Sequence, residues 1–276
     1  MTQPLSKHRH ISFTAHYTGY NWYQMGISHP AFATSKGKLL TTLLKPLELW
    51  AERVIGGSIR QTLAQRHIML DRALEQLIQQ HANIQVIEIA TGLSPRGWQF
   101  RQKYPTLRYL EVDLPEMAKI KQHALAQAGQ PDAEVLAVDL FTPQIAQMFA
   151  KVDTTAPLVI ISEGLVNYFD KEALHTLWHT LALHGKPFND FYYLTDLCPE
   201  PVQHPFARFV WKSSQLLRFL SRSAFSFHFT QPQEVISFFE NCGYRTISIE
   251  QPSQTTPEAT SNEHLGDFVW CVQAKL

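Results

Sequence analysis

The sequence predicts a doubly wound α/β fold, in which a mostly parallel sheet carries helices on both faces. From about residue 84 onward, short β-branched runs alternate with longer helical segments, which is typical of a parallel sheet covered by helices. The run at residues 157–161 is the most apolar of them, as expected of a strand buried on both faces. We therefore expect one large sheet with this run near its middle.

The elements can be placed in order along this part of the chain. Strands are expected at residues 85–90, 107–112, 134–138, 157–161, 191–195, 244–250 and 267–274. Helices are expected at 95–104, 115–128, 171–183, a short one from 143, and one before 243. Pro115 suits a first helical turn, Asp170 suits an N-cap, and Thr230 and Gln233 have capping-box spacing. The last two strands have a short link, so this pair must run antiparallel.

Two segments fall outside this alternation. Residues 1–83 are mostly helical after Lys36 and open with an aromatic run at 17–23, so we expect an N-terminal helical cap over the ligand edge of the sheet. Residues 84–276 would then form the core. Within the core, residues 201–229 interleave aromatic and leucine side chains with Arg and Lys, which predicts an inserted amphipathic helix. It could be core, oligomer contact or substrate lid, and we interpret it as a lid.

Composition excludes several classes of protein. The 276 residues include 24 Lys and Arg against 24 Asp and Glu, so the net charge is zero, and 45% are hydrophobic. A chain without net positive charge has no long-range electrostatic attraction for nucleic acid or an anionic membrane. Neither a signal peptide nor the about 20 apolar residues of a membrane span is found, and the three cysteines form no Cys-x-x-Cys pair. We expect a cytoplasmic protein without disulfides that acts on a small molecule, and leave a homodimer open.

Acidic residues stand at the ends of the first four strands, where ligands of open parallel sheets bind. Gly92, in the first turn, and Asp113, after the second strand, are 21 positions apart. This is close to the spacing of about 20 that places a carboxylate against ribose hydroxyls. The four acidic residues are Glu88, Asp113, Asp139 and Glu163.

The turn after the first strand argues against a phosphate-bearing ligand. Residues 90–97 contain neither the G-x-G-x-x-G pattern nor the Lys-Ser/Thr pair of a P-loop, and both would be expected to cradle phosphates. Four carboxylates would also repel phosphate groups. A ligand with ribose and adenine, positive charge and no phosphate fits better, and S-adenosylmethionine is such a ligand.

Four motifs together resemble a known family. Residues 86–93 (Val-Ile-Glu-Ile-Ala-Thr-Gly-Leu), 109–115 (Tyr-Leu-Glu-Val-Asp-Leu-Pro), 137–140 (Ala-Val-Asp-Leu) and 158–168 (Leu-Val-Ile-Ile-Ser-Glu-Gly-Leu-Val-Asn-Tyr) resemble successive motifs of the leucine carboxyl methyltransferase family. Residues 14–23 and 26–30 resemble its tetracenomycin polyketide O-methyltransferase-like branch. The resemblance implies a Rossmann-like class I methyltransferase fold that uses S-adenosylmethionine and releases S-adenosylhomocysteine.

The resemblance also implies roles for individual residues. Asp113 would hold the ribose diol, and Asp139 with Leu140 would contact the adenine. Gly92 and Glu163 would line the methionine part, with Glu88 nearby, and Arg66 would pair with the cofactor carboxylate, since a guanidinium binds a carboxylate bidentately. Alternatively, Arg66 could pair with Asp71 or Glu75 on a helix surface. The family commonly has a first glycine in the turn where this chain has Ala90.

Two other motifs carry weaker signals. His175 and His179 share a helix face but lack the adjacent glutamate of zinc proteases, so we expect a structural helix and no metal site. Ser94 lacks the surrounding G-x-S-x-G elbow because Arg96 takes the last position, which argues against a hydrolase.

We therefore expect an S-adenosylmethionine-dependent O-methyltransferase that acts on a small aromatic, polyketide-like or carboxylate acceptor by direct in-line transfer. A phenol acceptor would profit from a base, whereas a carboxylate is already an anion. The candidate bases are His16, Tyr17, Tyr20 and His204. An NAD-dependent oxidoreductase and an inactive cofactor-binding or assembly protein remain the alternatives.

Overall fold

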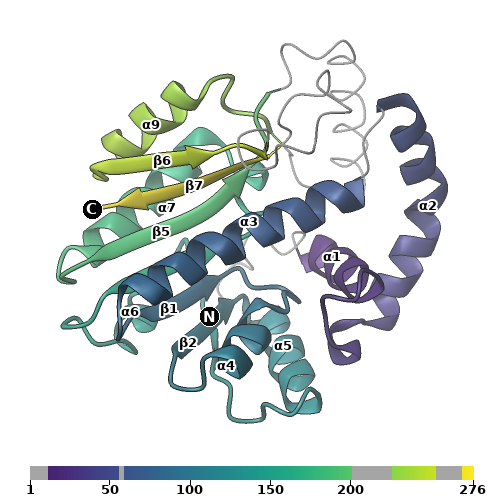
Figure 1. The fold of residues 1–276 in the computed structure, drawn as a ribbon, viewed down its shortest axis with the longest axis horizontal. Helices are drawn as coiled ribbons and strands as arrows, with labels where there is room; N and C mark the ends of the chain where they lie inside the picture. The colour runs from purple at the N-terminus through teal and green to yellow at the C-terminus, as the bar shows by residue number, and fades with distance from the viewer. Residues whose placement is uncertain (1–11, 56–58, 201–225, 253–268) are drawn as a thin grey trace, which may run out of the picture.

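The computed structural model describes residues 12–55, 59–200, 226–252 and 269–276. A seven-stranded sheet in the order β3-β2-β1-β4-β5-β7-β6 forms the centre of the fold (Figure 1). The strands from β1 to β5 pair in parallel, and β7 runs antiparallel to both β5 and β6. The predicted sheet, its central strand and its antiparallel end are confirmed. The strands are β1 Gln85–Ile89, β2 Arg108–Asp113, β3 Val135–Ala137, β4 Leu158–Ser162, β5 Phe191–Leu197, β6 Thr246–Glu250 and β7 Trp270–Lys275.

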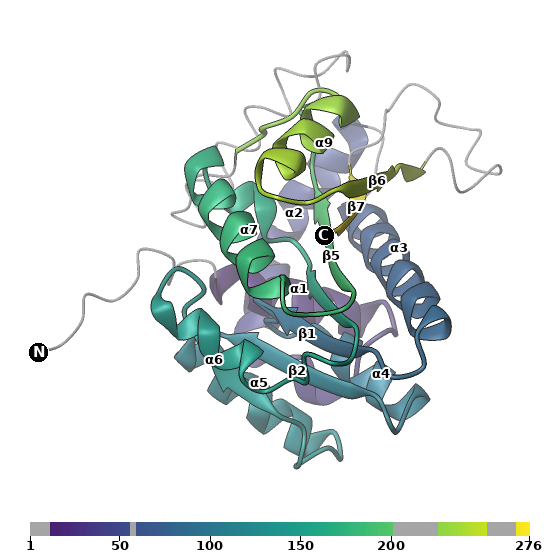
Figure 2. The same ribbon diagram turned by 90° about the vertical axis from the view of Figure 1, so that its left-hand side faces the viewer.

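Helices cover both faces of the sheet (Figure 2). On one face, α3 (Ile59–Gln80) and α4 (Arg96–Lys103) bury apolar side chains against strand residues such as Val86 and Val159. On the opposite face, α6 (Ala146–Phe149), α7 (Lys171–Gly185) and α9 (Pro232–Asn241) pack on Ile87 and Ile160. The alternate strand residues therefore point to two separate cores, as the period of a strand requires. Helix α5 (Pro115–Gln127) packs beside β3 at the edge.

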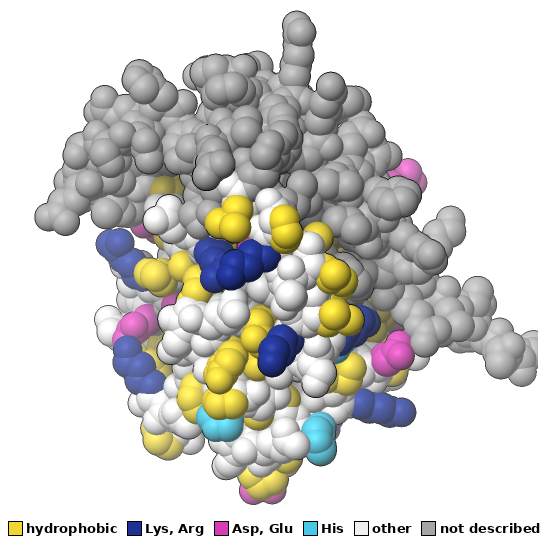
Figure 3. Space-filling view, turned by 90° about the vertical axis from the view of Figure 1, so that its right-hand side faces the viewer, with side chains coloured by type: hydrophobic (Ala, Val, Ile, Leu, Met, Phe, Trp, Pro, Cys, Tyr) yellow, Lys and Arg dark blue, Asp and Glu magenta, His cyan; other side chains and the backbone are white. Residues whose placement is uncertain are grey.

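The N-terminal helices lie at the carboxyl ends of the parallel strands (Figure 1). Helix α1 (Ser12–Gln24) packs on α2 (Ser35–Ile55), while the second half of α3 extends along the sheet and shares its core through Leu70, Leu74 and Leu77. A domain boundary at residue 83 stays a prediction. Helix α3 contacts both α1 and the sheet. The outer face of α2 mixes apolar and basic side chains (Figure 3), and its Leu39 and Leu43 are 59% and 66% exposed.

Local signals explain several helix ends. The Asp170 carboxylate accepts the Ala173 N–H at 2.8 Å, which confirms the predicted N-cap. The capping box of Thr230 and Gln233 is wrong: Glu234 accepts the Thr230 N–H at 2.7 Å, because α9 starts at Pro232 and brings residue 234 into reach.

Other predictions fall partly outside the described residues. Residues 201–225 of the expected lid lie there; residues 226–229 are not helical, and Phe229 is buried in the core. The three cysteines are free thiols, as predicted. Among the described helices, none is long and apolar enough to cross a membrane.

Candidate active site

The turn after β1 is held in an unusual backbone conformation. Ala90 and Gly92 both have a φ of +51°, the left-handed region that side chains other than glycine seldom adopt. Ala90 therefore takes a backbone conformation that glycine favours, at the position where the family commonly has a glycine. At Gly92 a side chain would also meet α1, because an added Cβ would lie 3.0 Å from the Ala15 Cβ.

Asp113 connects this turn to the end of β2. Its Oδ2 accepts the Gly92 N–H and its Oδ1 accepts the Leu114 N–H, both at 2.7 Å. Burial raises the pKa of Asp113 to about 6, against the opposing effect of these two backbone hydrogen bonds. Each carboxylate oxygen keeps a second lone pair. The side chain is ionised at neutral pH and can still accept two hydroxyl groups.

Asp139 lies two residues after β3 and, like Asp113, accepts a backbone N–H group. Its Oδ1 accepts the Phe141 N–H at 3.0 Å, and it and the neighbouring Leu140 are both half-buried. Because β3 pairs with β2 and the Val138 N–H donates to the Asp113 carbonyl, these two aspartates stand at adjacent strand ends.

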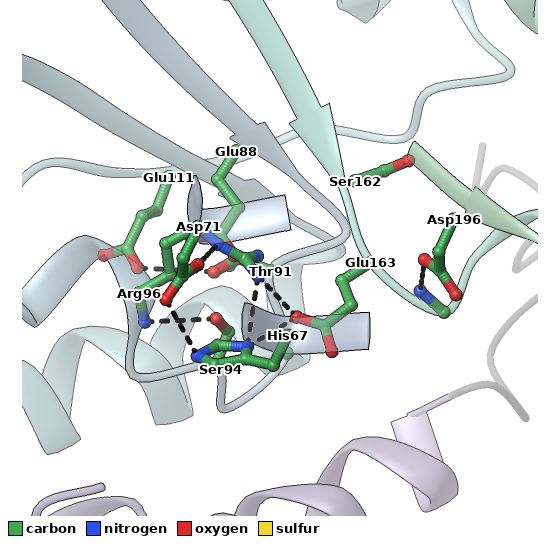
Figure 4. Close-up of polar contacts among 12 residues, drawn as sticks. His67, Asp71, Glu88, Thr91, Ser94, Arg96, Glu111, Ser162, Glu163 and Asp196 are labelled. Atoms are coloured by element: carbon green, nitrogen blue, oxygen red, sulfur yellow. Dashed lines mark hydrogen bonds and ion pairs between the residues drawn. The ribbon is translucent and has the colours of Figure 1, made fainter. Parts of the chain in front are cut away.

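Glu163, after β4, is surrounded by basic side chains (Figure 4). Its Oε1 accepts Arg66 Nε at 2.9 Å, and its Oε2 lies 2.7 Å from Arg96 Nη2 and 2.8 Å from His67 Nδ1. Burial raises the pKa of Glu163, but His67, Arg96 and Arg66 outweigh this effect and hold the pKa well below its ordinary value. Arg66 and Arg96 thus occupy two of about four acceptor positions on this carboxylate, and His67 Nδ1 lies within hydrogen-bond distance of it.

Glu88 does not line the crevice as expected. It is 1% exposed, and its oxygens accept Arg96 Nη1 at 3.0 Å and the Tyr109 hydroxyl at 2.9 Å. Arg96 is itself fully buried and also pairs with Asp71. Glu88 thus belongs to an internal ion network joining α3, β1, α4 and the loop after β4 (Figure 4).

Arg66 pairs with neither Asp71 nor Glu75, the partners of the alternative interpretation. Its Nε bonds Glu163, and its Nη1 lies 3.7 Å from the Asp196 Oδ2. Gly164 packs against the guanidinium, since an added Cβ there would lie 3.0 Å from Nη2. Sequence reasoning missed Asp196, although it too ends a strand, β5, and could have been found by the same rule.

A second buried network supports the turn from α5. Lys121 is fully buried, and its Nζ lies 2.9 Å from Glu111 Oε1 and 3.1 Å from Thr91 Oγ1. The turn's backbone N–H groups are also used within the protein: those of residues 91, 92, 94 and 96 donate to Val112, Asp113, Thr91 and Ser94. A phosphate would need free N–H groups here, so the geometry agrees with the absence of a glycine fingerprint.

The candidate bases differ in their surroundings. His16 is buried, its Nδ1 lies 2.9 Å from Thr34 Oγ1, and burial together with Lys36 lowers its pKa, so its imidazole is neutral at pH 7. The Tyr17 hydroxyl donates to Glu48, and burial and this carboxylate raise the pKa of Tyr17 well above its ordinary value. Tyr17 therefore stays protonated and is a poor base. Tyr20 is half-buried beside Tyr23, and His204 lies outside the described residues.

The two helical histidines make their contacts within the protein. The rings of His175 and His179 stack with centroids 5.8 Å apart, and His179 Nδ1 contacts the Cys242 carbonyl. In the described part of the chain, no group of three or more His, Cys, Asp or Glu residues is placed to hold a metal ion.

This fold, with acidic residues at its strand ends, agrees with the class of S-adenosylmethionine-dependent methyltransferases, to which the family comparison assigns the chain. The model of the leucine carboxyl methyltransferase family matches residues 32–182, more than half of the sequence. The chain belongs to this family, as the sequence motifs indicated. All seven residues predicted to lie at the cofactor site are within the match: Arg66, Glu88, Gly92, Asp113, Asp139, Leu140 and Glu163.

Similar proteins agree with this class. Two proteins provisionally named S-adenosyl-L-methionine-dependent methyltransferases, from Mycobacterium ulcerans and Mycobacterium marinum, are each 31% identical over 107 residues. The match covers 37% of this chain and spans only 35% of the length of each relative.

Among solved structures, the methyltransferase SibL has a TM-score of 0.52 at 12% identity, over 78% of this chain and 55% of its own. A provisionally named O-methyltransferase of Nostoc punctiforme has a TM-score of 0.50 at 13% identity, over 97% and 72%. Likenesses this distant show the fold alone.

Proposed function

We propose that this protein transfers the methyl group of S-adenosylmethionine to an oxygen atom of a small acceptor. The observation that carries the proposal is Asp113, an ionised carboxylate with spare acceptor capacity at the end of β2, within the family's matched region. A ribose diol offers two hydroxyl donors to such a carboxylate. A cytoplasmic location and a homodimer stay predictions.

The other strand ends suit the remaining parts of the cofactor. Asp139 and Leu140 would meet the adenine, one as a hydrogen-bond acceptor and the other as an apolar surface. Gly92 would let the backbone approach the methionine part, and Arg66 would bind its carboxylate. Glu163, held by three basic side chains, would fix the direction of Arg66 more than contact the cofactor itself.

The chain's own contribution to the reaction is position and exclusion of water. When bound, the cofactor supplies the methyl group and a sulfonium leaving group, and alignment can account for much of the rate of such a displacement. Helix α1 lies directly on the turn, with Ala15 near Gly92, and Gly19 is packed against Leu93. This helix would cover the reacting groups and keep water out.

The acceptor decides whether a base is needed. A carboxylate acceptor would need none, which agrees with the carboxyl chemistry named in the family's description. For a phenol, His16 is the better candidate, because its imidazole is neutral whereas Tyr17 keeps its proton.

The test uses S-adenosylmethionine labelled with tritium in the methyl group and two acceptor panels, small carboxylic acids and small phenols. Label transferred to either panel supports the proposal. Mild base releases methanol from a methyl ester and leaves a methyl ether intact, so the two chemistries separate. Failure to bind S-adenosylhomocysteine, together with binding of NAD, would support the oxidoreductase alternative and overturn the proposal.

A further inference from the structure

Asp196 is a buried carboxylate at the carboxyl end of β5 that the proposed cofactor contacts do not use. Its side chain is 3% exposed. Its Oδ1 accepts the Gly164 N–H at 2.6 Å, which ties the loop after β4 to the end of β5 (Figure 4). Its Oδ2 faces Arg66 Nη1 at 3.7 Å, a distance too long for a hydrogen bond.

The two contacts of Arg66 are therefore unequal. The bond from Nε to Glu163 is 2.9 Å, whereas the Asp196 contact is an ion pair without a hydrogen bond. The Arg66 side chain is only 13% exposed. Burying two charges is costly unless hydrogen bonds satisfy them. No hydrogen bond joins Arg66 Nη1 to Asp196 Oδ2, so this ion pair alone does not offset the cost of burying the two charges. Burial accordingly raises the pKa of Asp196, despite the opposing charge of Arg66.

A zwitterion would satisfy both groups. We propose that Arg66 and Asp196 together receive the amino-acid end of the cofactor, with Arg66 binding its carboxylate and Asp196 Oδ2 binding its ammonium group. This inference rests on the proposed function. Asp196 would be a specificity-determining residue for a ligand that carries both charges.

The surrounding groups support this assignment over Glu163 as the ammonium partner. Arg66, Arg96 and His67 all donate to Glu163 or lie within hydrogen-bond distance of it, so its negative charge is already compensated. Asp196 is held by backbone N–H groups, those of Gly164 and of Asp196 itself, and faces one distant cation. Cys198, which also faces this pair, is a neutral thiol because burial and Asp196 raise its pKa to about 12.

The test compares three ligands by calorimetry: S-adenosylhomocysteine, its analogue lacking the amino group, and 5′-methylthioadenosine, which lacks the whole amino-acid end. Wild-type protein and Asp196→Asn are measured with each. Asparagine keeps an oxygen for the Gly164 N–H and removes the charge. Asp190→Asn is the matched control, since Asp190 directly precedes β5 and pairs with Lys275 at the surface.

We expect Asp196→Asn to weaken S-adenosylhomocysteine binding about tenfold or more and to leave 5′-methylthioadenosine binding unchanged. Loss of the amino group should weaken binding to wild type and have little further effect in the variant. Unchanged affinity for S-adenosylhomocysteine, or an equal loss for all three ligands, overturns the assignment. If Asp196→Asn does not fold, Asp196→Glu replaces it: it keeps the charge and should discriminate the amino group, and failure to do so overturns the assignment. Wild-type protein that binds none of the ligands refutes the proposed function instead.

Discussion

Replacing Asp113 by asparagine should weaken cofactor binding and remove its pH dependence. In the structure this carboxylate accepts the Gly92 and Leu114 N–H groups and keeps one lone pair on each oxygen for the ribose diol. Asparagine has only one acceptor oxygen. Its NH₂ group must face one of the two backbone N–H donors, so one backbone bond and one hydroxyl bond are lost together.

The magnitude follows from these contacts. A hydrogen bond to a charged group contributes about 1.5–3 kcal/mol, so the loss of one hydroxyl bond should cost about 2 kcal/mol, or about 30-fold in Kd. The pKa of Asp113 is about 6 in the wild type. S-adenosylhomocysteine binding should therefore weaken as the pH falls through 6, approaching about tenfold per pH unit below it.

Stability should respond with the opposite sign. A folded pKa of about 6 lies above the unfolded value of about 3.9, so this group's contribution to stability is full below about pH 4 and is lost as the pH rises through 6. The free energy of unfolding of Asp113→Asn, relative to that of the wild type, should therefore be higher at pH 7 than at pH 4.

Calorimetry with S-adenosylhomocysteine between pH 5 and 8, and urea unfolding at pH 4 and 7, measure these effects. Asp132→Asn, at an exposed position after α5, is the control. An Asp113→Asn protein that binds S-adenosylhomocysteine like wild type at pH 7, or that keeps the wild-type pH dependence, would refute the ribose assignment.

Three further predictions test the supporting structure. Gly92→Ala should lower the free energy of unfolding by about 1–2 kcal/mol in urea titrations, because its Cβ would meet Ala15 in a left-handed residue; an unchanged midpoint would contradict this. Arg96→Met should cost about 3–5 kcal/mol in the same titration, since three carboxylates lose their fully buried partner; Lys103→Met, which removes a surface ion pair, should change little. Glu88→Gln should reduce the free energy of unfolding yet leave the Kd for S-adenosylhomocysteine unchanged. A higher Kd would instead indicate that Glu88 contacts the cofactor.

The strands could be predicted because a buried parallel strand is marked by its own residues. The apolar run at 157–161 was expected to be central, and β4 (Leu158–Ser162) pairs with β1 and β5. The place of Glu88 could not be predicted, because it depends on Arg96 and Tyr109, which reach it only after folding. Similarly, helix spacing predicted that Arg66 could pair with acidic residues of its own helix. Its observed partners, Glu163 and Asp196, lie about 100 residues or more away in sequence.

The acidic residues on the parallel strands, or directly after them, divide by the kind of donor that holds them. Arginine or lysine side chains hold the glutamates: Arg96 bonds Glu88 and Glu163, and Lys121 pairs with Glu111. Backbone N–H groups hold the aspartates Asp113, Asp139 and Asp196. Two of these donors, the N–H groups of Leu114 and Phe141, are close in sequence, as suits the short aspartate side chain, which bonds nearby backbone N–H groups.

A backbone N–H satisfies a carboxylate's geometry without cancelling its charge. This difference appears in the pKa directions, which are lowered for Glu111 and Glu163 despite burial, and raised by burial for Asp113 and Asp196. The glutamates therefore stabilise the turn and loops, whereas the negative charge of Asp113 and Asp196 is compensated less completely. A ligand with hydroxyl donors and positive charge, as S-adenosylmethionine has, compensates that charge. The aspartates are therefore where substitutions should change ligand affinity more than stability, and the buried glutamates and their basic partners are where the reverse should hold.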